Sequence, residues 1–574
     1  MTITYKPHKI KSVVAKLLAA KLLLFLLAVM VFSIFYLLSG YKSLVVWFTG
    51  LGGCFYRQEY WTHDFFTPSV KAAGNVYCTI ALVIAIVGLL PTYGLLIKKD
   101  KWEVGKTTVA INVADIFLAA LCLGAAYISW QWGKQLIVPT YDEVFSAQNC
   151  AGIHPFQTIA YYMLPNNHIF FNLLNNVFFH SFADKVVSGK LISLVCYCAV
   201  ILVVFIWMKS LLQNRWLAAL AAIVMAIQFP VWGFGFEARG YELLGLLEWV
   251  AFIALFRYLA IGDKRWLWIM ALASAAGYFT IPTFLYVHVA IVAFACIMQM
   301  MRKQPDFTFW KYQVITMAAV FMLYLPCLCF SGYKSITANQ YVTGQGYHAL
   351  VATILPTFQN YSDYCFGNII AGHYWFDLLL FFLPLCLLFY RNNKTAFSLG
   401  EFYILLWGGA FLLTLAMKIF PIDRALIGHF SITLALVVYT IYLLLGSLQE
   451  RLRLKLLRPL LLPVLLVLAG INFVKKDKQY AGFYICHFEM NPWHEMIIND
   501  GINIIPAGST IAFSDESFYW YYLCRNMGYK TSKCIQGNEA WFVKSAGEAF
   551  PAGMDRNYVP VKLVARIYTV YKHR

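Results

Sequence analysis

Long hydrophobic runs alternate with short polar connections along most of the chain, from near its start to about residue 474. A helix needs about 20 apolar residues to cross the hydrocarbon of a bilayer, and the runs have roughly that length. The period-two alternation that is typical of outer-membrane barrels is not seen in them. We therefore predict an all-α, multi-pass membrane region of about thirteen helices: Leu17–Gly40, Val76–Ile97, Thr107–Trp130, Leu191–Leu212, Leu217–Phe234, Glu242–Ile261, Trp266–Ile281, Thr283–Met301, Tyr312–Ser331, Phe376–Tyr390, Phe402–Phe420, His429–Leu445 and Pro459–Val474.

The composition supports this prediction. Of the 574 residues, 61% are hydrophobic and only 13% are charged, which excludes a soluble globular class. The formal charge of +18 does not indicate nucleic-acid binding, because the Lys and Arg residues lie between hydrophobic runs and form no patch. The basic start leads into an apolar run that is too long for the core of a cleavable signal peptide.

Basic residues in the connections predict the orientation. With the N-terminus in the cytoplasm, the outer connections hold about half as many basic residues as the cytoplasmic ones, which is the positive-inside bias. The long connections then share the outer side: Tyr41–Asn75, Gln131–Lys190, Gly235–Tyr241, Gly332–Trp375 and Pro421–Gly428. We expect a bacterial inner membrane, with the active site and the C-terminal region in the periplasm.

The composition changes after Val474. We divide the chain into a membrane domain at 1–474, with outer loops at 131–190 and 332–375, and an extracytoplasmic domain at 475–574. STIAFS, AWFVKS and VKLVARIYTVY predict strands, and ESFYWYYLCRNMG predicts a helix that ends at a Gly, so this domain is a small α/β unit. Cys524 and Cys534 could form a disulfide there, which the sequence leaves open.

An acidic pair directly outside the third predicted helix is the first candidate for chemistry. A carboxylate at the lipid–water boundary can accept a proton from a hydroxyl, so Asp142 is a candidate general base with Glu143 beside it. The structural alternative is that Asp142 caps the short helix EVFSAQN and Glu143 favours its first turn. The two interpretations are compatible, because a carboxylate that is held in place by capping the helix is also better positioned to act as a base.

The short outer connection GFGFEARGYE supplies Glu237, Arg239 and Tyr241. The planar guanidinium of Arg suits phosphate oxygens, whereas the structural alternative is interfacial anchoring or an internal Glu237–Arg239 ion pair. Arg424, next to Asp423, also faces outward and can join the site.

Histidines and buried charges add further candidates. His154, His168 and His180 fit no zinc spacing, and His168, which follows Asn166 and Asn167, is the most suggestive of them. In the predicted spans, Asp115 and Glu248 need partners, and Lys21 is a candidate for Asp115. We predict no metal ligands, although a requirement for a divalent cation stays open. The chain contains no Walker loop, no G-x-G-x-x-G motif after a strand and no H-E-x-x-H motif, which argues against an ATP-driven pump or a nucleotide-sugar enzyme.

Three segments resemble the GT-C glycosyltransferases, in particular the protein O-mannosyltransferase and lipid A aminoarabinose transferase group. They are YDEVFSAQN at 141–149, HPFQTIAYYML at 154–164 and EARGYELL at 237–244. The resemblance implies transfer of a sugar from a polyprenyl-phosphate carrier to a lipid, glycan or protein acceptor. It also implies that Asp142 is the catalytic acidic residue and that Arg239 lies near the donor phosphate.

The chain also departs from that group. Two predicted helices precede the one that leads to Asp142, where relatives have one, and a single Pro155 follows His154. No Lys closely follows the acidic pair, so Lys185 and Lys190 are late candidates for a second phosphate ligand.

These patterns together predict an inverting glycosyltransferase with Asp142 and Glu143 as catalytic residues. The expected substrate-binding residues are Glu237, Arg239, Tyr241, His168, Asn167, His154 and Arg424. The alternatives are a secondary transporter or flippase for a lipid-linked glycan, and a non-catalytic assembly protein. Transporters keep charged groups near the bilayer midplane, whereas the polar groups here gather on one side.

Overall fold

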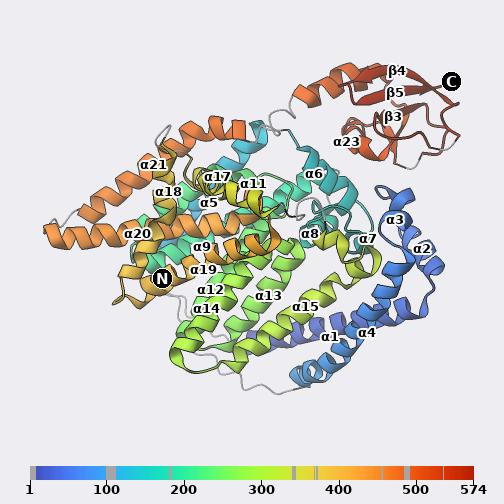
Figure 1. The fold of residues 1–574 in the computed structure, drawn as a ribbon. Helices are drawn as coiled ribbons and strands as arrows, with labels where there is room; N and C mark the ends of the chain where they lie inside the picture. The colour runs from blue at the N-terminus through green and yellow to red at the C-terminus, as the bar shows by residue number, and fades with distance from the viewer. Residues whose placement is uncertain are drawn as a thin grey trace.

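The computed structural model describes residues 8–97, 112–136, 138–179, 184–338, 344, 346–367, 369, 373–453, 457–483, 492–533, 535–551 and 553–574. Within these ranges, ten helices are long and apolar enough to cross a membrane (Figure 1). They are α1 (His8–Leu38), α4 (Pro68–Ile97), α5 (Val113–Leu136), α9 (Lys185–Leu212), α12 (Tyr241–Ile261), α14 (Leu285–Arg302), α15 (Phe307–Phe330), α19 (Lys394–Met417), α20 (Ile427–Leu452) and α21 (Leu457–Phe483).

The other three predicted spans are also helical, but they are shorter or broken. They correspond to α10 (Arg215–Ala226) with α11 (Phe229–Gly235), α13 (Lys264–Thr280), and α18 (Tyr374–Phe382) with the 3₁₀ segment η3 (Leu383–Phe389). A proline accompanies each interruption: Pro230 opens α11, Pro282 follows α13, and Pro384 opens η3. Proline lacks the backbone donor and disfavours helix in the residue before it, which explains why the hydrophobic run outlasts the helix.

The centre of the bundle is built from α9, α12 and α20, which pack together with α10, α13 and α19 around one large apolar core. Helices α1 and α4 pack on each other and on α15 at the edge. Asp115 on α5 lies 2.7 Å from Lys209 and 3.7 Å from Arg215, so its partners are on α9 and α10 and the suggested pairing with Lys21 is wrong. The other intramembrane acid, Glu248, lies 3.3 Å from His429, and both side chains are fully buried.

Short helices cover one end of this bundle and face the C-terminal domain (Figure 1). On the segments before α9 they are α2 (Tyr41–Thr49), α3 (Gln58–Asp64), α6 (Tyr141–Phe145), the π-helix η1 (Ser146–Ala151), α7 (Pro155–Ala160) and α8 (Ile169–Phe179). The later segments add η2 (Pro282–Phe284), α16 (Lys334–Thr337) and η4 (Asp423–Leu426), together with the longer helix α17 (Tyr347–Phe366). Asn-rich and aromatic sequence therefore forms a layer of surface helices, as expected for residues 131–190.

The C-terminal domain contains a five-stranded sheet with the strand order β2-β1-β3-β5-β4. Its elements are η5 (Ile497–Gly501), η6 (Ile502–Ile504), β1 (Thr510–Phe513), η7 (Asp515–Ser517), α23 (Phe518–Asn526), β2 (Lys530–Ser532), β3 (Trp541–Ser545), β4 (Tyr558–Val564) and β5 (Tyr568–His573). β1 is parallel to β2 and β3, whereas β5 is antiparallel to β3 and β4. The predicted fold class, a helical membrane protein with a small C-terminal α/β domain, is confirmed.

This domain docks on the surface helices through polar contacts at several points. The hydroxyl of Tyr519 donates to the carbonyl of Pro139 at 2.9 Å, and the ammonium group of Lys533 donates to the carbonyl of Gln148 at 2.8 Å. Glu516 accepts hydrogen bonds from Tyr56 and Tyr141.

The state of the cysteines bears on the pairing left open above. Cys524 is buried and carries a free thiol, so it does not pair with Cys534, which itself lies outside the described residues. Cys54, in the connection between α2 and α3, is disulfide-bonded.

Candidate active site

The acidic pair starts a short helix through a capping box. Thr140 is the N-cap residue: its hydroxyl accepts from the backbone N–H of Glu143 at 3.3 Å, and the Glu143 carboxylate accepts from the backbone N–H of Thr140 at 2.8 Å. The pattern T-x-x-E at the start of a helix explains this reciprocal pair. The interpretation of Asp142 as the cap is therefore wrong, and its carboxylate is free for contacts outside the helix.

Glu143 is fully buried and ties α6 to the connection that carries Arg239. Its second carboxylate oxygen accepts from the backbone N–H of Ala238 at 2.7 Å and lies 3.4 Å from the ammonium group of Lys190. Each oxygen of this carboxylate therefore has a partner in the protein. We conclude that Glu143 fixes the two segments relative to each other, and that Lys190 is occupied by this acid.

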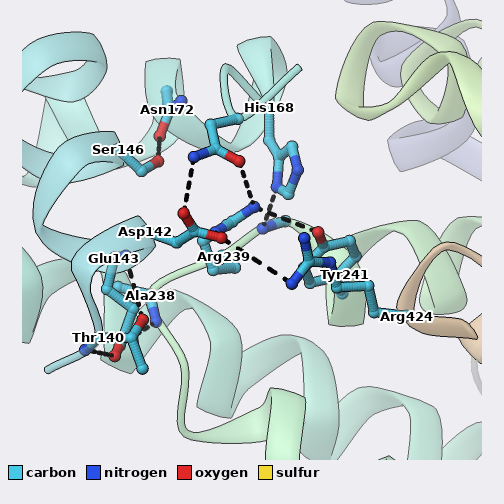
Figure 2. A network of polar contacts seen from close by, with 12 residues as sticks. Thr140, Asp142, Glu143, Ser146, His168, Asn172, Ala238, Arg239, Tyr241 and Arg424 are labelled. Atoms are coloured by element: carbon cyan, nitrogen blue, oxygen red, sulfur yellow. Dashed lines mark hydrogen bonds and ion pairs between the residues drawn. The ribbon is translucent and has the colours of Figure 1, made fainter. Parts of the chain in front are cut away.

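Asp142 lies at the centre of a polar network that joins three segments distant in sequence (Figure 2). Its Oδ2 atom is 2.8 Å from Nη1 of Arg239 and 3.9 Å from Nη1 of Arg424, and its Oδ1 atom accepts from the Asn166 amide at 2.9 Å. Its side chain is 33% exposed, whereas that of Arg239 is 2% exposed. The carboxylate is thus accessible, although its charge partner is not.

The protonation of Asp142 follows from these contacts. Burial raises the pKa of this carboxyl, but the charges of Arg239 and Arg424 and the hydrogen bond from Asn166 outweigh it. The pKa of Asp142 therefore lies well below its usual range, and the group is an anion at neutral pH.

Arg239 and Arg424 both present guanidinium groups to this network. Nη2 of Arg239 donates to the side-chain oxygen of Asn166 at 3.1 Å and to the Tyr241 hydroxyl at 3.2 Å. Both guanidinium groups also lie near the Tyr241 ring, at 5.2 and 6.0 Å from its centroid. Within the described part of the chain, the Nε–H group of each arginine is buried without a hydrogen-bond acceptor. The pair therefore retains capacity to bind an anion.

His168 completes the cluster. Its Nδ1 atom accepts from the backbone N–H of Gly240 at 2.9 Å, and its ring contacts Tyr241 edge-on with centroids 4.8 Å apart. Burial lowers the pKa of His168, and the nearby guanidinium groups lower it further. The imidazole is therefore neutral.

The remaining predicted residues lie at different distances from this centre. Glu237 is buried in the same connection as Arg239. Asn167 is also buried, but its amide holds the carbonyls of Thr158 and Tyr161, so it shapes the turn and does not face Asp142. His154 is exposed and caps α7 through Nδ1, so the structure does not bring it to the cluster. His180 lies outside the described residues.

A cavity of about 460 Å³ opens beside the cluster. Its wall is mostly apolar and is formed by residues near η2, by α16 and by the segment between α19 and η4. At one end the wall becomes polar, where Asn166, His168, Tyr241 and Arg424 meet. An apolar chamber with a cationic end suits a ligand that combines a hydrocarbon chain with an anionic group.

Asn166, Thr140 and the apolar segment 417–422 were not predicted as parts of the site. The T-x-x-E spacing could have revealed the cap, but no sequence signal separates Asn166 from Asn167, because the turn decides which amide faces Asp142. In the described ranges, no group of three or more His, Cys, Asp or Glu side chains is arranged to hold a metal ion.

Comparisons with known proteins give likenesses among solved structures. No protein-family model matches the chain, and neither does a curated protein. Among solved structures, it is similar to the cryo-EM structure of the arabinosyltransferase EmbB from Mycobacterium smegmatis, with 12% identity and a TM-score of 0.43. The match covers 85% of this chain and 49% of that one, so the chain spans about half the length of EmbB. A TM-score at this level does not establish a common fold.

Proposed function

We propose that this protein is an inverting glycosyltransferase that moves a sugar from a polyprenyl-phosphate carrier to a hydroxyl acceptor at the outer face of the membrane. The observation that carries the proposal is the meeting of Asp142, Arg239 and Arg424 beside an apolar cavity, whose polar end is lined by Arg424. A base, a pair of cations and a chamber for hydrocarbon are the parts that this reaction requires.

The reaction assigns a role to each group. The acceptor oxygen attacks the anomeric carbon from the face opposite the phosphate, which inverts that centre. The bond between the anomeric carbon and the phosphate oxygen breaks, and the carrier leaves as polyprenyl phosphate. Asp142 takes the proton of the acceptor hydroxyl, while Arg239 and Arg424 stabilise the negative charge that the leaving phosphate retains.

Substrate binding prepares the base. Without substrate, Arg239 and Arg424 lower the pKa of Asp142 and make it a weak base. A phosphate bound by the same two guanidinium groups competes for them and adds negative charge nearby, and both effects raise the pKa of Asp142. The carboxylate therefore becomes a better base when the donor is present.

The orientation of the site rests on two observations. The connection 41–75 contains the disulfide-bonded Cys54, and disulfides persist in oxidising compartments outside the cytoplasm. That connection contacts the C-terminal domain through Arg57, whose backbone N–H donates to Asp515 at 2.9 Å. Together with the positive-inside bias of the sequence, this supports an active site and a C-terminal domain in the periplasm of a bacterial inner membrane.

The test uses the purified full chain in proteoliposomes, supplied with a panel of polyprenyl-phosphate pentoses and hexoses. Release of free polyprenyl phosphate together with a newly glycosylated acceptor, both detected by mass spectrometry, supports the proposal. Movement of an intact lipid-linked glycan between leaflets without cleavage would instead identify a flippase. Retention of transfer in Asp142→Asn would exclude the assigned base.

A further inference from the structure

The hydrogen bond between Gly240 and His168 determines which ring nitrogen carries the proton. The backbone N–H of Gly240 donates to Nδ1 of His168 at 2.9 Å, and a ring nitrogen that accepts a hydrogen bond has no proton of its own. A neutral imidazole then carries its single proton on Nε2. His168 is therefore held as the Nε2–H tautomer.

The ring of His168 is closely packed around this bond. A Cβ atom on Gly240 would lie 3.0 Å from Cβ and 3.1 Å from Nδ1 of His168, so glycine permits this close approach. On its other side the ring lies against the Tyr241 ring, and only 2% of His168 is exposed.

The charged groups around the ring oppose a second proton. The charges of Arg239 and Arg424 lower the pKa of His168, and the charge of Asp142 raises it. Because Asp142 is paired with Arg239 at 2.8 Å, the local charge at the ring remains positive. His168 is thus unsuited to act as a general base or as a charged ligand.

The Nε2–H group has no hydrogen-bond acceptor among the described residues, although the ring lines the cavity. Arg424 lines the same end, and its Nε–H group also lacks an acceptor there. A ligand that fills this end covers both donors, and because a buried donor without an acceptor is costly, the ligand is expected to supply oxygen atoms with free lone pairs. The non-bridging oxygens of a phosphate diester are such acceptors, and they carry no proton at neutral pH.

We propose that His168 is a substrate-binding residue that donates its Nε2–H proton to a non-bridging phosphoryl oxygen of the ligand whose charge Arg424 neutralises. This inference rests on the proposed function, because it takes the ligand to be a lipid-linked phosphate. It specifies which atom of His168 contacts the phosphate and which tautomer of the ring makes that contact.

Two substitutions at His168 test the roles of the two ring nitrogens separately. In His168→Asn the side-chain oxygen can replace Nδ1 as the acceptor for Gly240, but no donor reaches the cavity. In His168→Gln the amide N–H reaches the position of Nε2, whereas the acceptor for Gly240 is lost. His154→Asn is the matched control, because His154 is exposed and Asn is an equally good helix cap.

The measurement is the affinity of a short-chain polyprenyl phosphate for each full-length variant in nanodiscs. We expect His168→Asn to bind about tenfold more weakly, His168→Gln to stay within a few-fold of the wild type, and His154→Asn to be unchanged. The corresponding polyprenol, which lacks phosphate, should bind the wild type and His168→Asn equally. Binding of inorganic phosphate alone shows whether the hydrocarbon chain of the ligand is needed. Wild-type affinity in His168→Asn, or a larger loss in His168→Gln than in His168→Asn, would overturn the inference.

Two results separate this inference from the proposed function. If the wild type transfers sugar and binds the phosphate but His168→Asn does both equally well, only the inference falls. If the wild type binds no polyprenyl phosphate, the proposed glycosyltransferase function is rejected, and so is the proposed ligand of His168. The tautomer is tested independently by nitrogen-15 NMR of histidine-labelled protein: between about pH 5 and 8, the His168 signals should keep a protonated Nε2 and an unprotonated Nδ1.

Discussion

The carboxylate of Asp142 and the guanidinium of Arg239 meet at 2.8 Å, although one residue begins a surface helix after α5 and the other precedes α12. The arginine is almost fully buried, so this ion pair balances a charge that water does not reach. Any anionic ligand that enters must compete with Asp142 for the same cation. The site therefore couples ligand binding to the state of its candidate base.

Replacing this base should separate binding from chemistry. In Asp142→Asn we expect transfer to fall by about 10²- to 10⁴-fold, the usual contribution of a general base. Binding of the phosphate-bearing donor should persist or improve, because both arginines lose their internal competitor. Initial rates and equilibrium binding measure the two effects. Asp64→Asn, an exposed acid on α3, is the matched control and should leave both unchanged.

The low pKa of Asp142 predicts how stability depends on pH. Burial opposes the ionised form, but Arg239 and Arg424 bring the pKa in the folded state below that in the unfolded state. The resulting stabilisation is present above the ordinary aspartate pKa of about 4 and is lost as the pH falls below it. In detergent, the melting temperature of the wild type should therefore decrease more steeply than that of Asp142→Asn as the pH is lowered from about 5 to 3. Parallel curves for the two proteins would contradict the assignment.

Glu143 and Lys190 should behave as a coupled pair. Glu143→Gln leaves Lys190 as a buried cation without its partner, a change that typically destabilises by about 3–5 kcal/mol. Adding Lys190→Met removes that charge, so the double variant should be more stable than the sum of the single changes predicts. Thermal unfolding of all four proteins gives the coupling, and additive effects would show that the pair is unimportant.

The close contact between α12 and α20 predicts a steric effect at Gly428. A Cβ atom there would lie 1.8 Å from the carboxylate oxygen and 2.9 Å from Cβ of Glu248, so Gly428→Ala forces the helices apart. We expect a loss of about 1–3 kcal/mol in stability. Gly408→Ala, in α19, meets no atom within 4 Å and should be neutral or slightly stabilising. Equal melting temperatures for the two variants would contradict this packing argument.

The sequence predicted the helices well because hydrophobic length reports directly on the bilayer. It also singled out Asp142, Arg239, Tyr241, His168 and Arg424, which the structure brings together in one cluster. Their partners depend on the path of the backbone, which the sequence pattern does not contain. Glu143 was predicted to be a catalytic residue beside Asp142, and in the structure its two carboxylate oxygens accept from the backbone N–H groups of Thr140 and Ala238.

Local geometry explains the other differences between the sequence-based predictions and the structure. His154 and His168 were both predicted to bind substrate, yet His154 caps α7, whereas His168 accepts from the backbone of Gly240 in the connection that carries Arg239. The prolines at the start of α11 and η3 shortened two predicted spans. The cavity could not be predicted, because its wall combines short stretches whose sequences are simply apolar.

One apolar cluster joins Tyr56, Val144 and Phe145 of the membrane domain to Phe518 and Trp520 of the C-terminal domain. Phe518 and Trp520 are synthesised only after the ten candidate transmembrane helices that precede them. Until then, the aromatic faces beside the acidic pair have no covering partner. A chain that ends before residue 518 would therefore leave an apolar surface exposed beside Asp142, where it can associate with other apolar surfaces.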